Sequence, residues 1–214
     1  MDYQLLAAQL RKPEGDFGIE VGEQMNLFNR EINLRTITLL NIEENEKVLE
    51  IGTGNGLFCK EVLKSNNSCT YTGVDYSELM VKEAFFKNQD WVNLKRADFM
   101  LAEASNLPFP DHYFHKIFTV NTLYFMENPE RELSEIKRLL KPGGLAIISI
   151  REKDSVQALP VTPYGFQLYN EDDLRKLLLK GGFSNVNILK EKDPEIIIEE
   201  TPLSYNSLYG MCWK

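Results

Sequence analysis

Cysteine is scarce in this chain. Its three cysteines, Cys59, Cys69 and Cys212, are scattered and show no paired C-x-x-C spacing. An odd number of widely spaced thiols argues against a disulfide framework and against a zinc site, so we expect no bound metal. Such cysteine usage fits a reducing compartment and predicts a cytoplasmic protein.

Long apolar runs and excess positive charge are also missing. No apolar run approaches the roughly 20 residues that span a bilayer, and the opening stretch MDYQLLAAQLRKPEG lacks a basic region ahead of an apolar core. We therefore expect neither a membrane span nor a secretory signal. The 24 Lys and Arg residues against 32 Asp and Glu give a net charge of −8. This balance repels a phosphate backbone, which disfavours a nucleic-acid partner.

What the chain does contain is an alternation of short apolar strands and amphipathic stretches from about residue 47. Its 214 residues suffice for one α/β domain with a sizeable core but are few for two. The alternation predicts a mainly parallel sheet wrapped by helices. The predicted strands are KVLEI, YTGVD, VNLKRA, KIFTV, LAIISI and NVNILK, and the predicted helices span 56–64, 77–87, 129–140 and 171–180.

The two ends of the chain do not fit this alternation. Residues 1–46 are interpreted as a helical lid or cap on the domain formed by 47–214. Within the lid we predict a short helix carrying Leu5, Leu6 and Leu10, a mobile loop at 12–18, and a helix over 26–40 with Leu27, Leu34, Ile37 and Leu40 inward. In the tail after residue 191, EIIIEE and SLYGMCW both look extended, and the pattern leaves open which one joins the sheet.

The stretch VLEIGTGNG, residues 48–56, carries the strongest site signal. In an open parallel sheet, ligands bind at the carboxyl ends of the strands, and glycines let backbone approach a ligand closely. Gly52, Gly54 and Gly56 alone could be a simple strand-to-helix turn. However, Glu50 precedes them and Asp75 ends the next strand, where a carboxylate can bind ribose hydroxyls. A dinucleotide fingerprint would place its third glycine one residue later, so the spacing points away from NAD.

These residues resemble the class I S-adenosylmethionine-dependent methyltransferases, in the broad small-molecule group that includes quinone-biosynthesis enzymes. The resemblance covers roughly residues 45–150 and rests on VLEIGTGNG, GVDYSELM, LAEASNLPFPDHYFHKIFTVNTLYF and EIKRLLKPGGLAIIS. It implies a Rossmann-like sheet of seven mainly parallel strands with helices on both faces. It also implies S-adenosyl-L-methionine as cofactor and a small-molecule methyl acceptor. A catalytically inactive module that binds this cofactor or its product is the alternative, and a nicotinamide-dependent oxidoreductase is a third possibility.

The resemblance also implies roles for single residues. Glu50 and the backbone of the glycine turn (Gly52, Gly54, Gly56) would surround the methionine amino end, and Asp75 would hold the ribose. Tyr76 would lie against the adenine, and the Asn121 carbonyl would face the methionine. Glu103 and the Ala104 N–H would bind the adenine edge. Two departures stand out: Glu103 replaces the usual Asp, with Asp98 as a nearby rival, and His115 stands where the family has an acid.

Methyl transfer from a sulfonium needs positioning more than a nucleophilic residue, and a general base matters only if the acceptor must lose a proton. Tyr124 and His112 are candidates for that base. Tyr164 and Tyr169 could face an acceptor, although core packing explains them as well. We assign no catalytic residue from the sequence, which also leaves the acceptor open.

Overall fold

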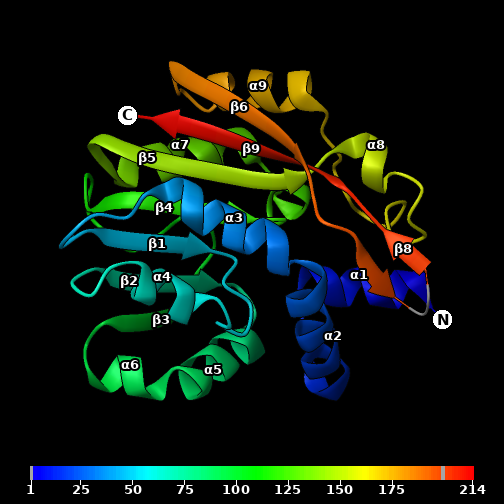
Figure 1. Ribbon diagram of the computed structural model, residues 1–214, viewed down its shortest axis with the longest axis horizontal. Coiled ribbons are helices and arrows are strands. Elements are labelled where there is room, and N and C mark those ends of the chain that lie inside the picture. The colour runs from blue at the N-terminus through cyan, green and yellow to red at the C-terminus, as the bar shows by residue number, and fades with distance from the viewer. Residues whose placement is uncertain (1, 199–200) are drawn as a thin grey trace.

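A seven-stranded sheet in the order β3-β2-β1-β4-β5-β9-β6 forms the centre of the computed structural model, which describes residues 2–198 and 201–214 (Figure 1). Strands β1 to β5 pair in parallel, and β9 runs antiparallel to both of its neighbours. The predicted mainly parallel sheet is confirmed. The strands are β1 (Lys47–Ile51), β2 (Thr70–Asp75), β3 (Ala97–Leu101), β4 (Phe114–Val120), β5 (Leu140–Arg151), β6 (Asn185–Lys192) and β9 (Asn206–Trp213).

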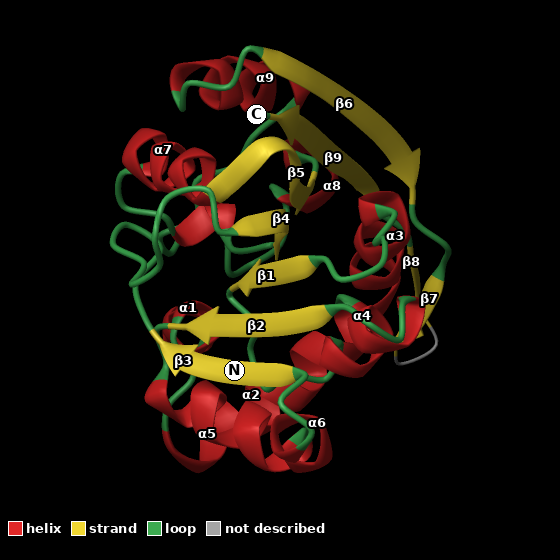
Figure 2. Ribbon diagram, turned by 90° about the vertical axis from the view of Figure 1, so that its left-hand side faces the viewer, coloured by secondary structure: helices red, strands yellow, loops and turns green. Residues whose placement is uncertain are grey.

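Helices cover both faces of the sheet (Figure 2). One apolar core lies under α7 and α9, and the other lies under α3, α4 and α5. The helices are α1 (Tyr3–Arg11), α2 (Gly15–Phe28), α3 (Arg30–Leu40), α4 (Cys59–Ser65), α5 (Glu78–Lys87), α6 (Gln89–Asn93), α7 (Pro129–Leu139), α8 (Lys153–Val156) and α9 (Glu171–Lys180), with a 3-10 turn η1 (Leu123–Phe125). None of the helices within the described ranges is long and apolar enough to cross a membrane.

Capping residues set the ends of the helices that the sequence predicts best. The Asn128 side chain accepts a hydrogen bond from the Arg131 N–H at the start of α7. Asn170 and Asp173 form a reciprocal capping box at the start of α9. These side chains satisfy backbone N–H groups that have no partner inside the helix. The predicted helices at 129–140 and 171–180 are therefore confirmed to within one residue.

The predicted strand over VNLKRA is wrong. Val92 and Asn93 belong to α6, Lys95 has a positive φ of 58°, and β3 begins only at Ala97. The short alternation of apolar and polar residues in VNLKRA is misleading, because Leu94 is 65% exposed and does not pack in the core. Arg96 stabilises the turn, since its guanidinium donates to the backbone carbonyls of the segment that leads into β2.

The amino-terminal segment is helical as predicted at 3–11 but differs beyond it. The predicted mobile loop at 12–18 already contains the first turn of α2, and the predicted helix over 26–40 is interrupted at Asn29. Leu27 is 66% exposed rather than inward, and Leu34 is half-buried, whereas Ile37 and Leu40 are buried as expected. The interruption redirects the chain, so that α3 packs on the sheet while α1 and α2 lie beyond the carboxyl ends of the strands (Figure 1).

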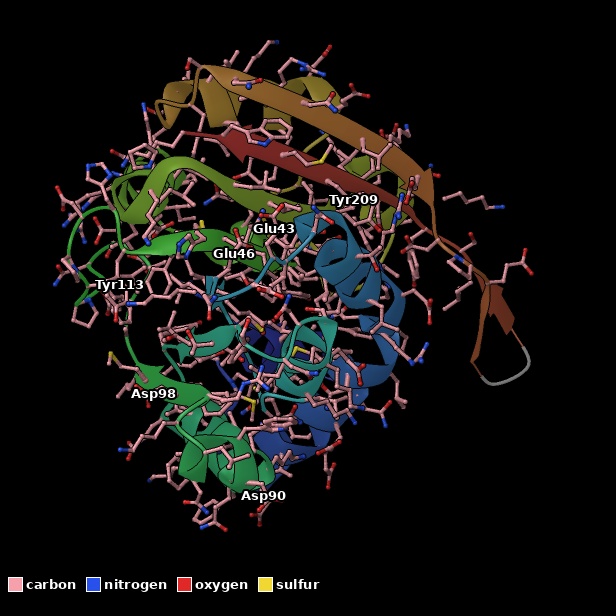
Figure 3. All side chains as sticks on the ribbon, turned by 60° about the vertical axis from the view of Figure 1, so that its left-hand side comes forward. Glu43, Glu46, Asp90, Asp98, Tyr113 and Tyr209 are labelled. Carbon is pink, nitrogen blue, oxygen red and sulfur yellow. The ribbon has the colours of Figure 1, made fainter. Side chains whose placement is uncertain are left out.

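The structure also answers which part of the tail joins the sheet. SLYGMCW belongs to β9, which lies between β5 and β6. The isoleucines of EIIIEE form β7 (Ile196–Ile198), which pairs with β8 (Thr201–Leu203) in a separate two-stranded sheet, and Glu199 and Glu200 lie outside the described residues. Figure 3 shows this hairpin projecting from the body of the molecule.

Candidate active site

The glycine turn follows β1 directly and is tied to the end of β2. The backbone N–H groups of Gly52 and Thr53 both donate to the Val74 carbonyl, at 2.8 and 3.1 Å. Gly52, Gly54 and Gly56 all have a positive φ, between 55° and 78°. Because β2 and β4 flank β1 on opposite sides, the turn lies where the strand order reverses, which is the usual ligand crevice of such sheets.

The three glycines serve different purposes. A Cβ on Gly52 would approach Thr122 Oγ1 to 2.2 Å, and a Cβ on Gly56 would meet Ala84 Cβ of α5 at 2.8 Å. A Cβ on Gly54 would have no atom within 4 Å. Gly52 and Gly56 are thus required by packing inside the protein, whereas Gly54 faces open space in the crevice.

Asp75 is connected to this open position. Its Oδ2 accepts a hydrogen bond from the Gly54 N–H at 2.9 Å, and its Oδ1 accepts one from the Ser77 N–H at 2.9 Å. The residue is only 8% exposed, and burial raises the pKa of its carboxyl group. Each oxygen has a second lone pair, so the carboxylate can still accept hydrogen bonds from a ligand.

Glu50 lies beneath the turn and is 3% exposed. Its Oε2 accepts a hydrogen bond from the Tyr71 hydroxyl, and the Thr53 hydroxyl lies 3.5 Å from the same oxygen. Tyr71 and Thr53 are themselves 2.6 Å apart. Burial, with the nearby charge of Asp75 as a smaller cause, raises the pKa of Glu50 to about 8.

The amino-terminal segment covers the side of the crevice next to Asp75. The Tyr76 hydroxyl donates to the Arg11 carbonyl, and the Ser77 hydroxyl donates to the Pro13 carbonyl at 2.6 Å. Burial raises the pKa of Tyr76 to about 12, so its hydroxyl remains a donor. The link between α1 and α2 therefore lies directly against the residue that is predicted to contact adenine.

Helix α2 reaches the glycine turn itself. The Asn26 amide donates to Asn55 Oδ1 at 3.1 Å, and the Asn55 amide donates to Glu23 Oε1 at 3.3 Å. Asn55 is buried within the turn between Gly54 and Gly56. The predicted lid is thus hydrogen-bonded to the same loop that presents Gly54.

Glu103 and Ala104 follow β3, at the same carboxyl end of the parallel strands as Asp75. The Ala102 N–H donates to the Asp75 carbonyl, which anchors this loop beside the crevice. Glu103 is exposed and Ala104 is half-buried. The rival Asp98 accepts a hydrogen bond from the Phe99 N–H. It is the second residue of β3 and so lies near the amino end of the strand, away from the crevice.

Asn121 directly follows β4 and has a φ of 55°. Its amide donates to Asn29 Oδ1 at 3.0 Å, and its Oδ1 lies 3.1 Å from the Tyr124 hydroxyl. Asn29, which separates α2 from α3, is therefore hydrogen-bonded to the residue that follows β4. The structure brings Glu50, Gly54, Asp75 and Asn121 to one edge of the sheet, as the sequence predicts.

The candidate bases have structural roles. Tyr124 is buried, accepts from the Arg151 N–H at 2.6 Å and can donate to the Arg151 carbonyl, and burial raises its pKa further above its usual value. His112 precedes β4 and therefore lies at the opposite edge of the sheet from the crevice.

His115, which stands where the family has an acid, accepts a hydrogen bond from the Lys47 N–H at its Nδ1 and contacts Lys141 at its Nε2. Burial lowers the pKa of His115.

The sequence reasoning missed Tyr71 and Thr53. The signal was present, because the period of two in a strand places Tyr71 and Asp75 on the same face of β2. Register pairs Glu50 with Gly73, which lies between them on that face. A tyrosine at this position, next to an acid on the adjacent strand, indicates a buried hydrogen bond.

Comparison with known proteins identifies the class to which this chain belongs. Residues 49–148 match the family model described as a methyltransferase domain. The uncharacterized methyltransferase YdaC of Bacillus subtilis is 27% identical over 171 residues, which cover 79% of this chain and 90% of YdaC. YrhH of the same bacterium, also named a methyltransferase, is 30% identical over 129 residues, covering 58% of this chain and 71% of YrhH.

A solved SAM-dependent methyltransferase from Aquifex aeolicus shares the fold, with a TM-score of 0.67 over 99% of both chains at 20% identity. The chain belongs to the methyltransferase domain family and has the Rossmann-like class I fold. It is an S-adenosylmethionine-dependent methyltransferase, and S-adenosylmethionine is its methyl donor.

The residues present fit this donor. Gly54 leaves open the space that a Cβ would fill, and the Asp75 carboxylate at the end of β2 has acceptor capacity for two hydroxyl groups. The Asp75 carboxylate gives the crevice negative charge, which favours a ligand carrying an ammonium and a sulfonium over a pyrophosphate.

Proposed function

We propose that this methyltransferase acts on a small-molecule acceptor bound beside the carboxyl ends of β4 and β5, within the broad group that includes quinone-biosynthesis enzymes. Aromatic side chains gather there: Phe125 and Phe166 have ring centroids 4.7 Å apart, and Tyr124 and Phe166 are 5.8 Å apart. The segment after β5 folds onto η1, since the Gln167 N–H donates to the Tyr124 carbonyl. An aromatic wall suits an apolar or ring-bearing acceptor. The net charge of −8 opposes a nucleic acid.

We assign the cofactor residues as the resemblance implies. Glu50 with the backbone of Gly52, Gly54 and Gly56 would face the methionine amino end, and Asp75 would hold the ribose. At the adenine end we assign Tyr76, Glu103 and Ala104, and at the methionine we assign the Asn121 carbonyl. The observation that carries this assignment is the hydrogen bond from the Gly54 N–H to Asp75, beside the open space at Gly54.

The donor supplies a methyl group on a sulfonium, whose positive charge already activates the leaving group. The protein then has to align the acceptor with the methyl group, and such positioning can be worth on the order of 7–11 kcal/mol. The Tyr124 hydroxyl is engaged with the backbone of Arg151 and is therefore unsuited to remove a proton. We assign this residue to the pocket wall and propose in-line displacement without a nucleophilic residue.

Two measurements test this function. Calorimetric titration with S-adenosylmethionine and with NAD should give binding of the first only, and binding of NAD alone would overturn the assignment. Transfer of a labelled methyl group to a panel of quinols, phenols and amines should give turnover on at least one class. Turnover confined to protein or nucleic-acid substrates would overturn the small-molecule proposal.

A further inference from the structure

Tyr71 is a buried tyrosine that the cofactor contacts named above do not include. It is 1% exposed near the start of β2, and its ring packs against Phe99 at 5.8 Å between centroids. Its hydroxyl donates to Glu50 Oε2 and lies 2.6 Å from Thr53 Oγ1. A buried tyrosine hydroxyl requires a polar partner, and here both partners come from β1 and the glycine turn.

The neighbouring strand is shaped to allow this contact. Gly73 pairs with Glu50 across the β1–β2 ladder and shares a face of β2 with Tyr71. A Cβ on Gly73 would lie 2.8 Å from Thr53 Oγ1, 2.9 Å from Phe99 Cδ1 and 3.0 Å from Tyr71 Cε1. The absence of a side chain at Gly73 thus leaves room for the tyrosine ring to extend to the Glu50 carboxyl group.

The surroundings of Glu50 disfavour a negative charge. The titratable groups that face it are Tyr71 and Asp75 from β2 and Cys59 from α4. Asp75 opposes ionisation of Glu50, as does burial, while the hydrogen bonds from Tyr71 and Thr53 favour it. With a pKa of about 8, the carboxyl group keeps its proton at pH 7 in the protein without cofactor.

We propose that Tyr71 is a positioning residue, which with Thr53 holds the Glu50 carboxyl group beneath the glycine turn as a protonated acid that ionises when the cofactor's ammonium group binds. Glu50 goes from carboxylic acid to carboxylate, its proton passes to the buffer, and no covalent bond to the cofactor forms. Tyr71 then stabilises the carboxylate by its hydrogen bond. This inference rests on the proposed place of Glu50 at the methionine amino end.

The first experiment counts protons. The full chain is titrated calorimetrically at pH 7 with S-adenosylhomocysteine and with S-adenosylmethionine, in buffers of different ionisation enthalpy. We expect net release approaching one proton per site with both ligands at pH 7, because both carry the ammonium group there. The release should fall as the pH rises through 8, where Glu50 ionises without the ligand, and should turn into uptake above pH 9, where the ligand's own amino group is neutral before it binds. Tight binding without proton release overturns the inference and leaves the cofactor site intact. Release with S-adenosylmethionine alone assigns the effect to the sulfonium and also overturns it. Binding of neither ligand overturns the site assignment itself.

The second experiment uses variants. Glu50→Gln should abolish proton release. Tyr71→Phe should weaken S-adenosylhomocysteine binding on the order of tenfold at pH 7, with recovery toward wild type as the pH rises past 9, because the carboxyl group then ionises at higher pH. Tyr209→Phe is the matched control, a tyrosine also 1% exposed but on β9. It should leave affinity and proton count unchanged.

A merely structural role for Tyr71 would give another result. Affinity would then fall equally at every pH, with the wild-type number of protons released. That outcome would overturn the inference, provided that circular dichroism shows Tyr71→Phe to be folded. Glu50→Gln supplies an independent test should Tyr71→Phe fail to fold.

Discussion

The carboxyl group of Glu50 makes the stability of the folded chain depend on pH. Burial raises its pKa from the usual 4.5 to about 8, so the folded chain binds this proton more tightly than the unfolded chain does. The contribution of this tighter proton binding to the free energy of unfolding is complete below pH 4.5 and is lost as the pH rises toward 8. Glu50→Gln should therefore raise the midpoint of thermal unfolding relative to wild type at pH 9, an advantage of at most a few kcal/mol in order of magnitude. At pH 5 the two proteins should differ little. An equal difference at both pH values would instead indicate a packing effect.

Asp75 links the glycine turn to the proposed ribose site. Asp75→Ala removes the acceptors of the Gly54 and Ser77 N–H groups together with any ligand contact. We expect the affinity for S-adenosylhomocysteine to fall by at least about 2 kcal/mol, roughly thirtyfold in Kd, when measured by calorimetry. Asp75→Asn keeps one oxygen acceptor and should lose less. Unchanged titration of Asp75→Ala would contradict the ribose assignment.

At the level of single residues, the sequence identified the acids at the strand ends because strand period and glycine spacing are local. It could not decide among the candidate bases, since that depends on which edge of the sheet a loop occupies and on what its side chain already binds. His112 lies before β4, and the hydroxyl of Tyr124 is engaged by the backbone of β5. Both facts come from tertiary structure.

The glycine turn is an element whose three glycines can be separated by experiment. Gly54→Val places a branched side chain in the open space of the crevice and strains a position with φ of 55°, which costs about 1–2 kcal/mol. We expect cofactor binding to be lost in calorimetry while circular dichroism shows a folded protein. Gly54→Ala carries similar backbone strain with a shorter side chain, so it should retain more of the binding.

Gly56→Val is the contrasting variant. Its side chain would collide with Ala84 of α5, where even a Cβ lies at 2.8 Å, so we expect it to lower the unfolding temperature much more than Gly54→Val does. If Gly54→Val binds the cofactor normally, the crevice is not where we place it. If both variants unfold alike, Gly54 has a packing role that its surroundings do not indicate.

Among helices, those with capping residues were predictable, and those shaped by contacts were not. Asn128 and Asn170 are recognisable in the sequence as the N-cap residues of α7 and α9. The break at Asn29 has no such signal, because apolar residues continue on both sides of it. It follows from contacts to distant elements: the Phe28 carbonyl accepts from Arg151, and the Asn29 side chain bonds Asn121.

For the whole molecule, the parallel part of the sheet followed from the alternation of strands and helices, but the position of the last strand did not. Strand β9 enters between β5 and β6, and its residues look no different from the tail segment that forms β7. Which tail segment joins the sheet depends on its pairing with strands that are far away in the sequence. The residues of the segment itself do not specify that pairing. The sequence also could not show how closely the amino-terminal segment approaches the cofactor residues.

That closeness changes what removal of residues 1–25 should do. The interpretation of residues 1–46 as a lid predicts from the sequence that deletion of residues 1–25 impairs use of the acceptor more than binding of the cofactor. In the structure the Arg11 and Pro13 carbonyls accept hydrogen bonds from Tyr76 and Ser77, and Glu23 accepts one from Asn55 in the glycine turn. We therefore expect the truncated protein to bind S-adenosylhomocysteine on the order of tenfold more weakly in calorimetry.

The truncated chain should nevertheless remain folded, because α3 lies outside the deletion and keeps its buried contacts with the sheet. Leu27→Ala, a change at an α2 side chain that is 66% exposed, is the control and should leave the affinity unchanged. If the folded truncation binds S-adenosylhomocysteine as tightly as wild type but transfers methyl groups poorly, residues 1–25 serve the acceptor and our expectation is wrong. If cofactor affinity and methyl transfer fall in equal measure, residues 1–25 are part of the cofactor site, because the hydrogen bonds that close the crevice also hold the donor in place.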